Sequence, residues 1–316
     1  MVLSGGDMKA MQVNGSQHGA KLLPVEMAKP EPHEGEVLIR VHAAGVTPTE
    51  LLWYPTTHTK DGAARTDAVP GHEFSGVIAA LGKEVHGFNV GDEVYGMNDW
   101  FANGATAEFC IALPQNIAPK PTSLNHDAAA TVPIGALTAL QGLSERTEVL
   151  PGERVLVHGG AGAVGLYAVQ LAHRRGAYVI ATASAKNLHF VKQLGADEVI
   201  DYAASRFEEK VKDVDVVFDT VGGATRDRSW RVLKAGGRMV TIAADSEGRD
   251  DQRTKNAFFI VESNQVQLME IGKRLDTGEL KAFVNGVVPL NEASDAYSGT
   301  LNRKSGYGKI VISMSA

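Results

Sequence analysis

A glycine-rich segment is the clearest chemical motif of this 316-residue chain. Residues 159–165 read GGAGAVG and follow the apolar run 154–158, so the pattern GxGxxG lies between a predicted strand and a predicted helix. In such a turn Gly160 permits the tight bend, Gly162 lets backbone N–H groups approach a pyrophosphate, and Gly165 lets the helix lie close to the sheet. A purely structural turn is the alternative, but the strand–turn–helix context favours dinucleotide binding.

The residues after the second predicted strand indicate which nicotinamide cofactor is bound. In NAD enzymes an acidic residue about 20 positions beyond the fingerprint binds the ribose 2′-hydroxyl. Residues 183–187 read ASAKN here and contain no carboxylate. Because Ser184 and Lys186 offer a hydroxyl and an ammonium to a 2′-phosphate, and Tyr202 follows the third strand, we expect NADPH rather than NADH. Alternatively, Ser184 caps the next helix and Lys186 is a solvated first-turn residue.

Composition and charge exclude several classes of function. The net charge of −6 comes without a basic stripe that would attract nucleic acid or anionic lipid. The first seven residues, MVLSGGD, lack the features of a secretory signal, and no run of about 20 apolar residues follows. The single cysteine, Cys110, supports neither an internal disulfide nor a cysteine-rich metal site. We expect a cytoplasmic protein with a small-molecule partner, without nucleic acid or membrane.

The predicted secondary-structure pattern changes near residue 150. From about residue 8 to residue 130, short β-rich runs are separated by glycine and proline, which predicts an antiparallel β unit. Its clearest strands are residues 36–42, 74–81 and 92–97. From about residue 151, strands alternate with helices, which predicts a parallel sheet. These strands are residues 154–158, 178–183, 198–201, 215–220 and 238–243.

The helices predicted between these strands each end near a glycine. They are residues 164–175, 186–194, 225–233 and 264–276, followed by Gly176, Gly195, Gly236 and Gly278. After residue 283 the strand pattern returns. Residues 309–314 suit a strand at a sheet edge or closure, so we expect the tail to return to the first domain.

Six segments resemble the medium-chain dehydrogenase/reductase superfamily, over residues 9–312. They are residues 42–46 (HAAGV), 69–76 (VPGHEFSG), 90–94 (VGDEV), 160–165 (GAGAVG), 218–223 (FDTVGG) and 308–311 (GKIV). The resemblance implies an α/β protein with two domains. A GroES-like β-rich catalytic domain is expected at residues 1–130 and 284–316, and a Rossmann doubly wound parallel-sheet domain that binds NADPH at residues 131–283. A homodimer is expected from the resemblance as well.

The sequence departs from the zinc alcohol dehydrogenases of this superfamily. Their three ligands to the catalytic zinc are two cysteines and a histidine, and those places hold Thr47, His72 and Ile134 here. One histidine does not hold zinc, and the four-cysteine lobe for structural zinc is missing after residues 92–94. We expect no metal, with His72 and Glu73 as hydrogen-bonded structural residues.

This zinc-free pattern resembles the quinone oxidoreductases and related enone or enoyl reductases. In that branch Thr138 is expected near the nicotinamide or the phosphate bridge, and Val221 near the adenosine. The nicotinamide end is expected to be lined by Ala243, Ala244, Phe259 and Val261. The complete expected cofactor site is Thr138, Gly160, Gly162, Ala163, Val164, Gly165, Ser184, Lys186, Tyr202, Val221, Ala243, Ala244, Phe259 and Val261.

Without a metal, a simple ketone has no electrophile to stabilise its developing alkoxide. A quinone or an α,β-unsaturated carbonyl instead delocalises the added charge, so catalysis can consist largely of positioning. Thr49 and Tyr54 are the candidate catalytic residues, and Thr47, Trp53 and Trp100 the candidate substrate-pocket residues.

Ordinary structural roles explain several of these side chains equally well. Thr49 can be a turn or cap residue, and Tyr54 and the two tryptophans can be half-buried packing. Asp99, beside Trp100, suits a side chain that caps its loop. Cys110 lies in an apolar strand pattern and is expected to be buried and inert.

The sequence thus predicts an NADPH-dependent, zinc-independent oxidoreductase that transfers hydride to a quinone or an α,β-unsaturated carbonyl. Two alternatives remain open at this point. One is an NADPH-dependent carbonyl reductase that uses a non-metal acid, and the other is a non-catalytic NADPH-binding protein, because a fingerprint supports binding and says nothing of turnover.

Overall fold

The computed structural model describes residues 6–14, 21–299, 301 and 306–314. These residues form two compact units. Unit 1 comprises the described residues within Met1–Pro133, Ser263–Ser305 and Lys309–Ala316. Unit 2 comprises Ile134–Glu262 and Gly306–Gly308. The domain boundaries expected at residues 130 and 283 stay a prediction.

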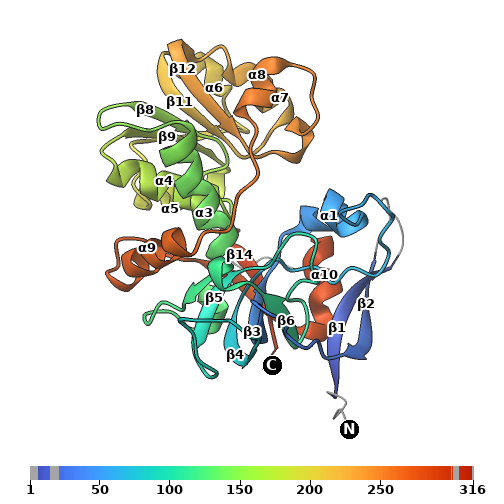
Figure 1. The fold of residues 1–316 in the computed structure, drawn as a ribbon. Coiled ribbons are helices and arrows are strands. Elements are labelled where there is room, and N and C mark those ends of the chain that lie inside the picture. The colour runs from blue at the N-terminus through green and yellow to red at the C-terminus, as the bar shows by residue number, and fades with distance from the viewer. Residues whose placement is uncertain (1–5, 15–20, 300, 302–305, 315–316) are drawn as a thin grey trace. The chain divides into compact units, whose positions relative to one another are not determined.

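Unit 1 is built on a seven-stranded sheet, counted over the described residues (Figure 1). Its order is β13 (Val284–Pro289), β14 (Lys309–Ser313), β3 (Val37–Gly45), β4 (Glu73–Leu81), β5 (Glu93–Met97) and β7 (Ile117–Pro119), and β6 (Phe109–Ala112) also pairs with β3. All pairs are antiparallel except β13 with β14. The predicted antiparallel unit is therefore confirmed.

Shorter elements complete unit 1. The strands β1 (Asp7–Asn14) and β2 (Lys21–Ala28) form an antiparallel pair of their own. The helical elements are η1 (Pro48–Leu52), α1 (Tyr54–Thr57), η2 (Pro114–Asn116), α2 (His126–Ala129), α9 (Gln265–Asp276), η6 (Leu290–Glu292) and α10 (Ala293–Ser298). Helix α9 is fixed to this unit because Gln265 Nε2 donates to the carbonyls of Pro114 and Ile117, and Tyr95 donates to that of Leu268.

The tail of the chain returns to unit 1, as expected, but its strand is not at an edge. Strand β14 lies between β13 and β3. All five of its residues are buried, Lys309 included. A strand that is covered on both faces and paired on both sides has no solvent-facing positions, so the alternation of its sequence was misleading.

Unit 2 contains a five-stranded parallel sheet, again counted over the described residues. Its order is β10 (Glu198–Asp201), β9 (Tyr178–Ala183), β8 (Arg154–Val157), β11 (Val214–Asp219) and β12 (Leu233–Thr241). The chain runs outward from β8 to β10 and then crosses back to β11 on the other side of β8. This reversal is the doubly wound Rossmann topology, in which ligands bind at the carboxyl ends of the strands beside the first one.

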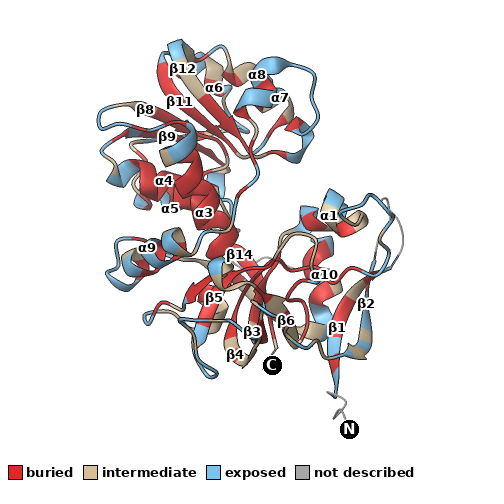
Figure 2. Cartoon of the chain, viewed as in Figure 1, coloured by how far each residue is buried: buried red, intermediate tan, exposed pale blue. Residues whose placement is uncertain are grey.

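Helices connect these strands. They are α3 (Pro133–Gln141), η3 (Gly142–Arg146), α4 (Gly165–Arg174), η4 (Ala185–Asn187), α5 (Leu188–Gln193), α6 (Phe207–Lys210), α7 (Gly223–Ser229), η5 (Ala244–Ser246) and α8 (Gln252–Ala257). Helix α4 is buried from Gly165 to Ala172, which Figure 2 shows as a mostly red helix. It therefore presents its N-terminus from a rigid, packed position.

One predicted helix is wrong at its end. A helix over residues 225–233 closed by Gly236 was expected, but α7 ends at Ser229 and Leu233 already pairs with Val214 in β11. Gly236, with φ +75°, lies in β12 where its register against β11 shifts. The pairing of β12 with β11 decided this segment, because helical spacing alone cannot reveal a partner strand.

His158 follows β8 and is completely buried in the centre of unit 2. Its Nδ1 lies 3.2 Å from Thr182 Oγ1 and its Nε2 lies 2.8 Å from Ser229 Oγ. Burial lowers the pKa of His158 to about 4, although the negative charge of Asp219 opposes this shift. The imidazole is therefore neutral at pH 7 and joins the sheet to α7 through hydroxyl groups.

This neutral histidine predicts an acid-sensitive fold. The pKa in the folded state lies below the unfolded value of 6.5, so the unfolded state binds the proton more tightly and stability falls as pH drops from 6.5 towards 4. From pH 7 to pH 5 the loss due to His158 should be about 2 kcal/mol. Urea unfolding of His158→Gln should show a shallower pH dependence than the wild type, whereas the exposed control His189→Gln should follow the wild type. Parallel curves for all three proteins would contradict this assignment.

Candidate active site

The fingerprint loop of unit 2 is a turn that glycine alone fits. Gly159 has φ +72°, so the left-handed position of the turn is at Gly159 rather than at Gly160, where the sequence placed the tight bend. Gly160 instead lies close to neighbouring side chains, since an added Cβ would be 3.1 Å from Ala181 and from Val191. A Cβ on Gly165 would lie 2.1 Å from the Gly159 carbonyl oxygen, which explains the predicted close approach of helix and sheet.

The N-terminus of α4 offers free donors next to this turn. The backbone N–H groups of Ala163, Val164 and Gly165 have no hydrogen-bond partner within the described part of the chain. Unsatisfied N–H groups at a helix N-terminus form a site for an anion, and their partial positive charge favours phosphate. This segment therefore fits the pyrophosphate of a dinucleotide.

The end of β9 presents the residues expected to choose the cofactor. Ser184 precedes η4, and its hydroxyl makes no capping hydrogen bond, so the alternative of a helix cap is not observed. Lys186 is exposed and has no ion pair to any described residue. Tyr202 is 63% exposed, and its N–H donates to the Ala183 carbonyl at 3.2 Å. A hydroxyl and an ammonium without counter-ion fit a 2′-phosphate.

The C-terminal segment also reaches this place, which the sequence did not reveal. Asn187 Nδ2 donates to the Gly306 carbonyl at 3.0 Å, and the Tyr307 ring stacks on Phe190 with centroids 3.7 Å apart. The Gly308 N–H donates to Ala161 of the fingerprint loop at 3.4 Å. Residues 306–308 thus lie against both the loop and the end of β9, and only the tertiary fold brings them there.

The loops after β11 and β12 are held together by a buried carboxylate. Asp219 accepts hydrogen bonds from the N–H groups of Val221 and Gly222 and from Thr241 Oγ1 at 2.8 Å. Because Asp219 is fully buried, these bonds compensate the loss of its hydration. Val221 is consequently exposed at the carboxyl edge of the sheet, near the start of η5 with Ala243 and Ala244.

Of the residues expected at the nicotinamide end, Ala243, Phe259 and Val261 are buried and Ala244 is exposed. Phe259 and Val261 are 5% and 6% exposed. The Gln141 amide fixes the segment after them, since Glu262 N–H donates to its oxygen and its Nε2 donates to the Glu262 carbonyl. Thr138 Oγ1 donates to the Ile134 carbonyl at 2.6 Å, which leaves only its acceptor capacity for a ligand.

Unit 1 contains a group of polar side chains, here called the polar cluster: Thr47, Glu50, His72, Glu73 and Lys309. All but the partly buried Thr47 are buried. Glu50 comes from η1, and its Oε1 accepts hydrogen bonds from His72 Nδ1 and from the Gly71 N–H at 2.7 Å. Glu73 opens β4 and is paired with Lys309, which opens β14. The Lys309 ammonium also lies 3.5 Å from Thr47 Oγ1.

Two glycines make room for this cluster. A Cβ on Gly45 would lie 2.7 Å from Glu73 Cγ and 2.6 Å from the Ala130 carbonyl oxygen. Gly71 has φ +94°, and a Cβ there would lie 2.6 Å from Thr106 Oγ1. The HAAGV and PGHE segments therefore contain glycine where the cluster meets the backbone.

The cluster carries its charges in an environment nearly free of water. Glu50 and Glu73 are 0% exposed, His72 2% and Lys309 4%. Burial lowers the pKa of Lys309 to about 7, and the negative charge of Glu50 opposes this shift. Burial also raises the pKa of the Tyr297 phenol, with the charge of Glu50 adding to the effect. The expectation that His72 and Glu73 are hydrogen-bonded is thus met.

A zinc ion does not fit this donor set. The Lys309 ammonium lies against both Glu73 and Thr47, and a cation there repels a divalent metal. Within the polar cluster His72 offers one imidazole nitrogen without a hydrogen bond to any described residue, its Nε2, and a catalytic zinc site needs three protein ligands. Among the residues that the structure describes, no group of three His, Cys, Asp or Glu side chains could hold a metal.

An aromatic group lies beside the polar cluster. The rings of Trp53 and Trp100 meet edge to face with centroids 5.4 Å apart, and Trp100 is also 5.4 Å from the His72 ring. The structure thus brings the two predicted substrate tryptophans together. Asp99 caps its loop by accepting from the Phe101 N–H at 2.9 Å, as expected.

The two candidate catalytic residues, Thr49 and Tyr54, are exposed. Tyr54 is 50% exposed and stacks on His58 at 4.5 Å. Thr49 is exposed, and its hydroxyl has no hydrogen bond to any residue the structure describes. Their catalytic roles stay predictions. Cys110 is buried, as expected, and burial raises the pKa of its thiol to about 12. That the thiol is inert stays a prediction.

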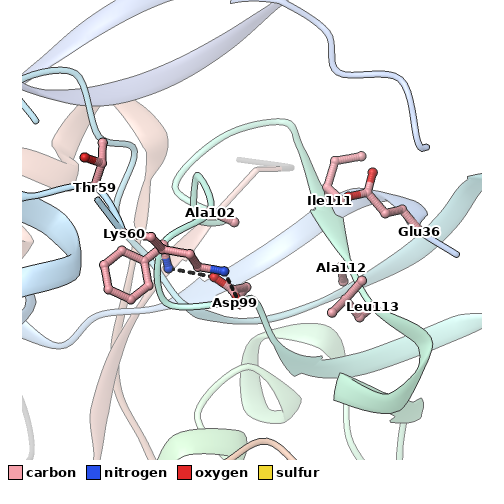
Figure 3. A pocket seen from close by; sticks show the side chains of 9 residues that line it. Glu36, Thr59, Lys60, Asp99, Ala102, Ile111, Ala112 and Leu113 are labelled. Carbon is pink, nitrogen blue, oxygen red and sulfur yellow. Dashed lines mark hydrogen bonds and ion pairs between the residues drawn. The ribbon is translucent and has the colours of Figure 1, made fainter. Parts of the chain in front are cut away.

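A hollow of about 420 Å³ lies elsewhere on unit 1. Figure 3 shows Lys60 and Asp99 paired at 3.4 Å on one side of it, with Glu36 and Leu113 on the other. None of the predicted substrate residues lines this hollow. It is therefore not the substrate site that the sequence predicted.

Comparisons with known proteins identify the family. Residues 33–122 match the model described as "Alcohol dehydrogenase GroES-like domain", and residues 194–312 match "Zinc-binding dehydrogenase". The chain is 34% identical to the chloroplastic NADPH-dependent alkenal/one oxidoreductase of Arabidopsis thaliana, over 97% of this chain and 79% of that protein. It is 29% identical to the quinone oxidoreductase of Mus musculus, over 92% of each.

A solved structure agrees. The quinone oxidoreductase from Coxiella burnetii superposes with a TM-score of 0.88 at 31% identity, over 98% of this chain and 99% of that one. The chain belongs to the medium-chain dehydrogenase/reductase superfamily, in its quinone oxidoreductase-like branch. The predicted combination of a GroES-like domain and a Rossmann-like parallel sheet is confirmed. As a member of this superfamily, the protein is an oxidoreductase that uses a nicotinamide cofactor.

None of the helices in the described residues combines the length and apolar character needed to cross a bilayer.

Two members of the polar cluster escaped the sequence analysis. Glu50 was not among the residues that the sequence analysis selected from its segment. Lys309 was quoted as part of GKIV but was given no role. The sequence did contain a signal. An acidic residue stands three positions after Thr47 and a lysine stands inside a strand pattern, and charged residues of both types are rarely buried. Their pairing with His72 and Glu73 is a long-range contact that the sequence does not show.

The buried Lys309–Glu73 pair predicts a large effect on stability. Lys309→Met should lower the free energy of unfolding by about 3–5 kcal/mol, because it leaves the Glu73 carboxylate buried without a counter-ion. Urea unfolding followed by tryptophan fluorescence measures this. The exposed pair of Lys60 and Asp99 provides the control, since Lys60→Met should cost less than about 1 kcal/mol.

A second substitution tests the cause. Adding Glu73→Gln to Lys309→Met should recover part of the loss, because the amide needs no counter-ion. If Lys309→Met unfolds like the wild type, the pair does not contribute as argued.

Proposed function

We propose that this protein is an NADPH-dependent reductase of quinones or α,β-unsaturated carbonyl compounds that acts without zinc. The observation that carries the proposal is the position of the Lys309 ammonium beside Thr47 and Glu73, which leaves no donor set for a Lewis-acid ion. Acceptors that stabilise added charge by delocalisation need less help than a simple ketone does. The names of the alkenal/one and quinone oxidoreductases among its relatives support the same substrate class.

The cofactor would be held mainly by backbone groups. The N–H groups of Ala163, Val164 and Gly165 would bind the pyrophosphate, and Ser184 and Lys186 the 2′-phosphate. Bound there, the reduced nicotinamide supplies a hydride. Thr138, Phe259 and Val261 would orient its nicotinamide end, and because all three are buried they would exclude water there.

The substrate would be held by the aromatic group of unit 1. Trp53 and Trp100 offer flat apolar surfaces to a conjugated acceptor. Thr47 offers a hydroxyl beside Lys309, and we keep Thr49 and Tyr54 as candidate catalytic residues. We also propose that the protein forms a homodimer, as the family resemblance implies. We further propose that it is cytoplasmic, as the single buried cysteine suggests.

Acceptor specificity gives the first test. NADPH oxidation, followed by absorbance, should be fast with 9,10-phenanthrenequinone and but-3-en-2-one and at least 100-fold slower with butanal. A chelator should leave these rates unchanged. Preference for butanal would favour a carbonyl reductase, and NADPH binding without turnover on any acceptor would favour a binding protein. Loss of activity on chelation, restored by zinc, would refute the metal-free mechanism.

Cofactor choice gives a second test. Lys186→Glu should weaken NADPH binding by about 10- to 100-fold, because a charge-assisted hydrogen bond worth about 1.5–3 kcal/mol is replaced by repulsion. NADH binding should change little. Dissociation constants from NADPH and NADH fluorescence measure both, with Lys210→Glu as a control at an exposed lysine of the same unit. Equal weakening of both cofactors would count against the assigned phosphate site.

A further inference from the structure

The buried pair of Glu50 and His72 resembles an acid–base dyad. His72 Nδ1 is bonded to Glu50 Oε1, which also accepts from the Gly71 N–H. This bond fixes the ring and leaves Nε2 as its free end. Nε2 is buried, and it has no hydrogen-bond partner within the described residues. A buried nitrogen without a partner is costly, so an unpaired Nε2 calls for an explanation.

The neighbour of this imidazole is Trp100, with ring centroids 5.4 Å apart and planes tilted by 42°. Trp100 in turn meets Trp53 edge to face. A conjugated acceptor that lies against Trp100 would therefore be close to the free end of His72. The remaining charged or titratable groups of this region are Glu73 from β4, Lys309 from β14 and Tyr297 from α10.

We propose that His72 is the proton donor of the reduction and that Glu50 is its positioning residue. This inference rests on the proposed function and adds the acid that the metal-free site otherwise lacks. A histidine that is oriented by a carboxylate through Nδ1 can exchange a proton at Nε2, and the carboxylate stabilises the imidazolium.

The step balances in atoms and electrons. An α,β-unsaturated ketone takes the hydride from reduced nicotinamide at its β-carbon, and the C=C electron pair shifts so that oxygen becomes an enolate anion. The Nε2–H bond of His72 then breaks, and its proton goes to that oxygen. The bonding electrons stay on Nε2, so the imidazole becomes neutral, and solvent returns the proton before the next turnover.

Acceptors should differ in their dependence on His72. An enolate is a strong base and gains much from a positioned acid, whose contribution is typically about 10²–10⁴-fold. The anion formed from a quinone is an aromatic phenolate with delocalised charge, and water can protonate it more readily. Loss of His72 should therefore affect enones far more than quinones.

The sharpest variant is His72→Asn. The asparagine amide nitrogen can take the place of Nδ1 and keep the hydrogen bond to Glu50, while Nε2 is removed. His126→Asn is the matched control, because His126 Nδ1 is also bonded, at 2.8 Å from Ser75 Oγ, and this residue has no part in the proposed site. NADPH binding and thermal unfolding of both variants show whether they fold.

We expect kcat of His72→Asn with but-3-en-2-one to fall at least 100-fold and kcat with 9,10-phenanthrenequinone less than fivefold. Glu50→Gln should lower kcat with the enone while leaving KM within about twofold, which a disrupted fold would not do. His126→Asn should match the wild type. If His72→Asn reduces the enone within threefold of the wild type, or loses both acceptors equally, the proposal is overturned.

A binding measurement tests the dyad without turnover. The oxygen of 4-nitrophenolate mimics the anionic oxygen of the enolate, and its absorbance reports binding to the cofactor-free protein. His72→Asn should bind it at least tenfold more weakly than the wild type and His126→Asn, and equal affinities would contradict the proposal. If the wild type oxidises NADPH with none of the acceptors tested, the proposed function is wrong. The titration with 4-nitrophenolate still tests whether His72 binds an anionic oxygen.

Discussion

Compensation of buried charge organises unit 1 of this protein. Glu50, His72, Glu73 and Lys309 come from three separate segments, and each is almost completely shielded from water. An isolated ion in such surroundings is strongly unfavourable, so each group requires its partner at hydrogen-bond distance. The requirement joins η1, the start of β4 and the start of β14, a strand that lies inside the sheet.

The same compensation of charge limits the chemistry that the polar cluster can support. A lysine ammonium neutralises Glu73 and approaches Thr47, which stands at one of the three places that hold zinc ligands in the zinc alcohol dehydrogenases. The charge that a metal would bring is already present as an ammonium. What remains for chemistry is a histidine fixed by a carboxylate and two tryptophans beside it.

Unit 2 relies on backbone rather than on side-chain charge. Its fingerprint loop is shaped by a left-handed Gly159 and by the contact of Gly165 with the loop backbone, and α4 is buried along most of its length. Three free N–H groups at the start of that helix then form an anion site whose geometry needs no side chain. The proposed preference for NADPH over NADH depends instead on side chains at the rim of this site, namely Ser184, Lys186 and Tyr202.

The sequence by itself determined the fold class, the family and several of the elements. Strands 178–183 and 198–201 were placed to the residue, because period and punctuation act over a few neighbours. It also located the fingerprint and the loss of zinc ligands, since these depend on residue type at a fixed spacing.

Only the tertiary structure decided what long-range pairing controls. The early end of α7, the interior place of β14, the contact of residues 306–308 with the fingerprint loop and the pairing of Glu50 with His72 all join residues distant in the chain. Their energies come from burial and from partners found on other segments, and local spacing carries no information about either.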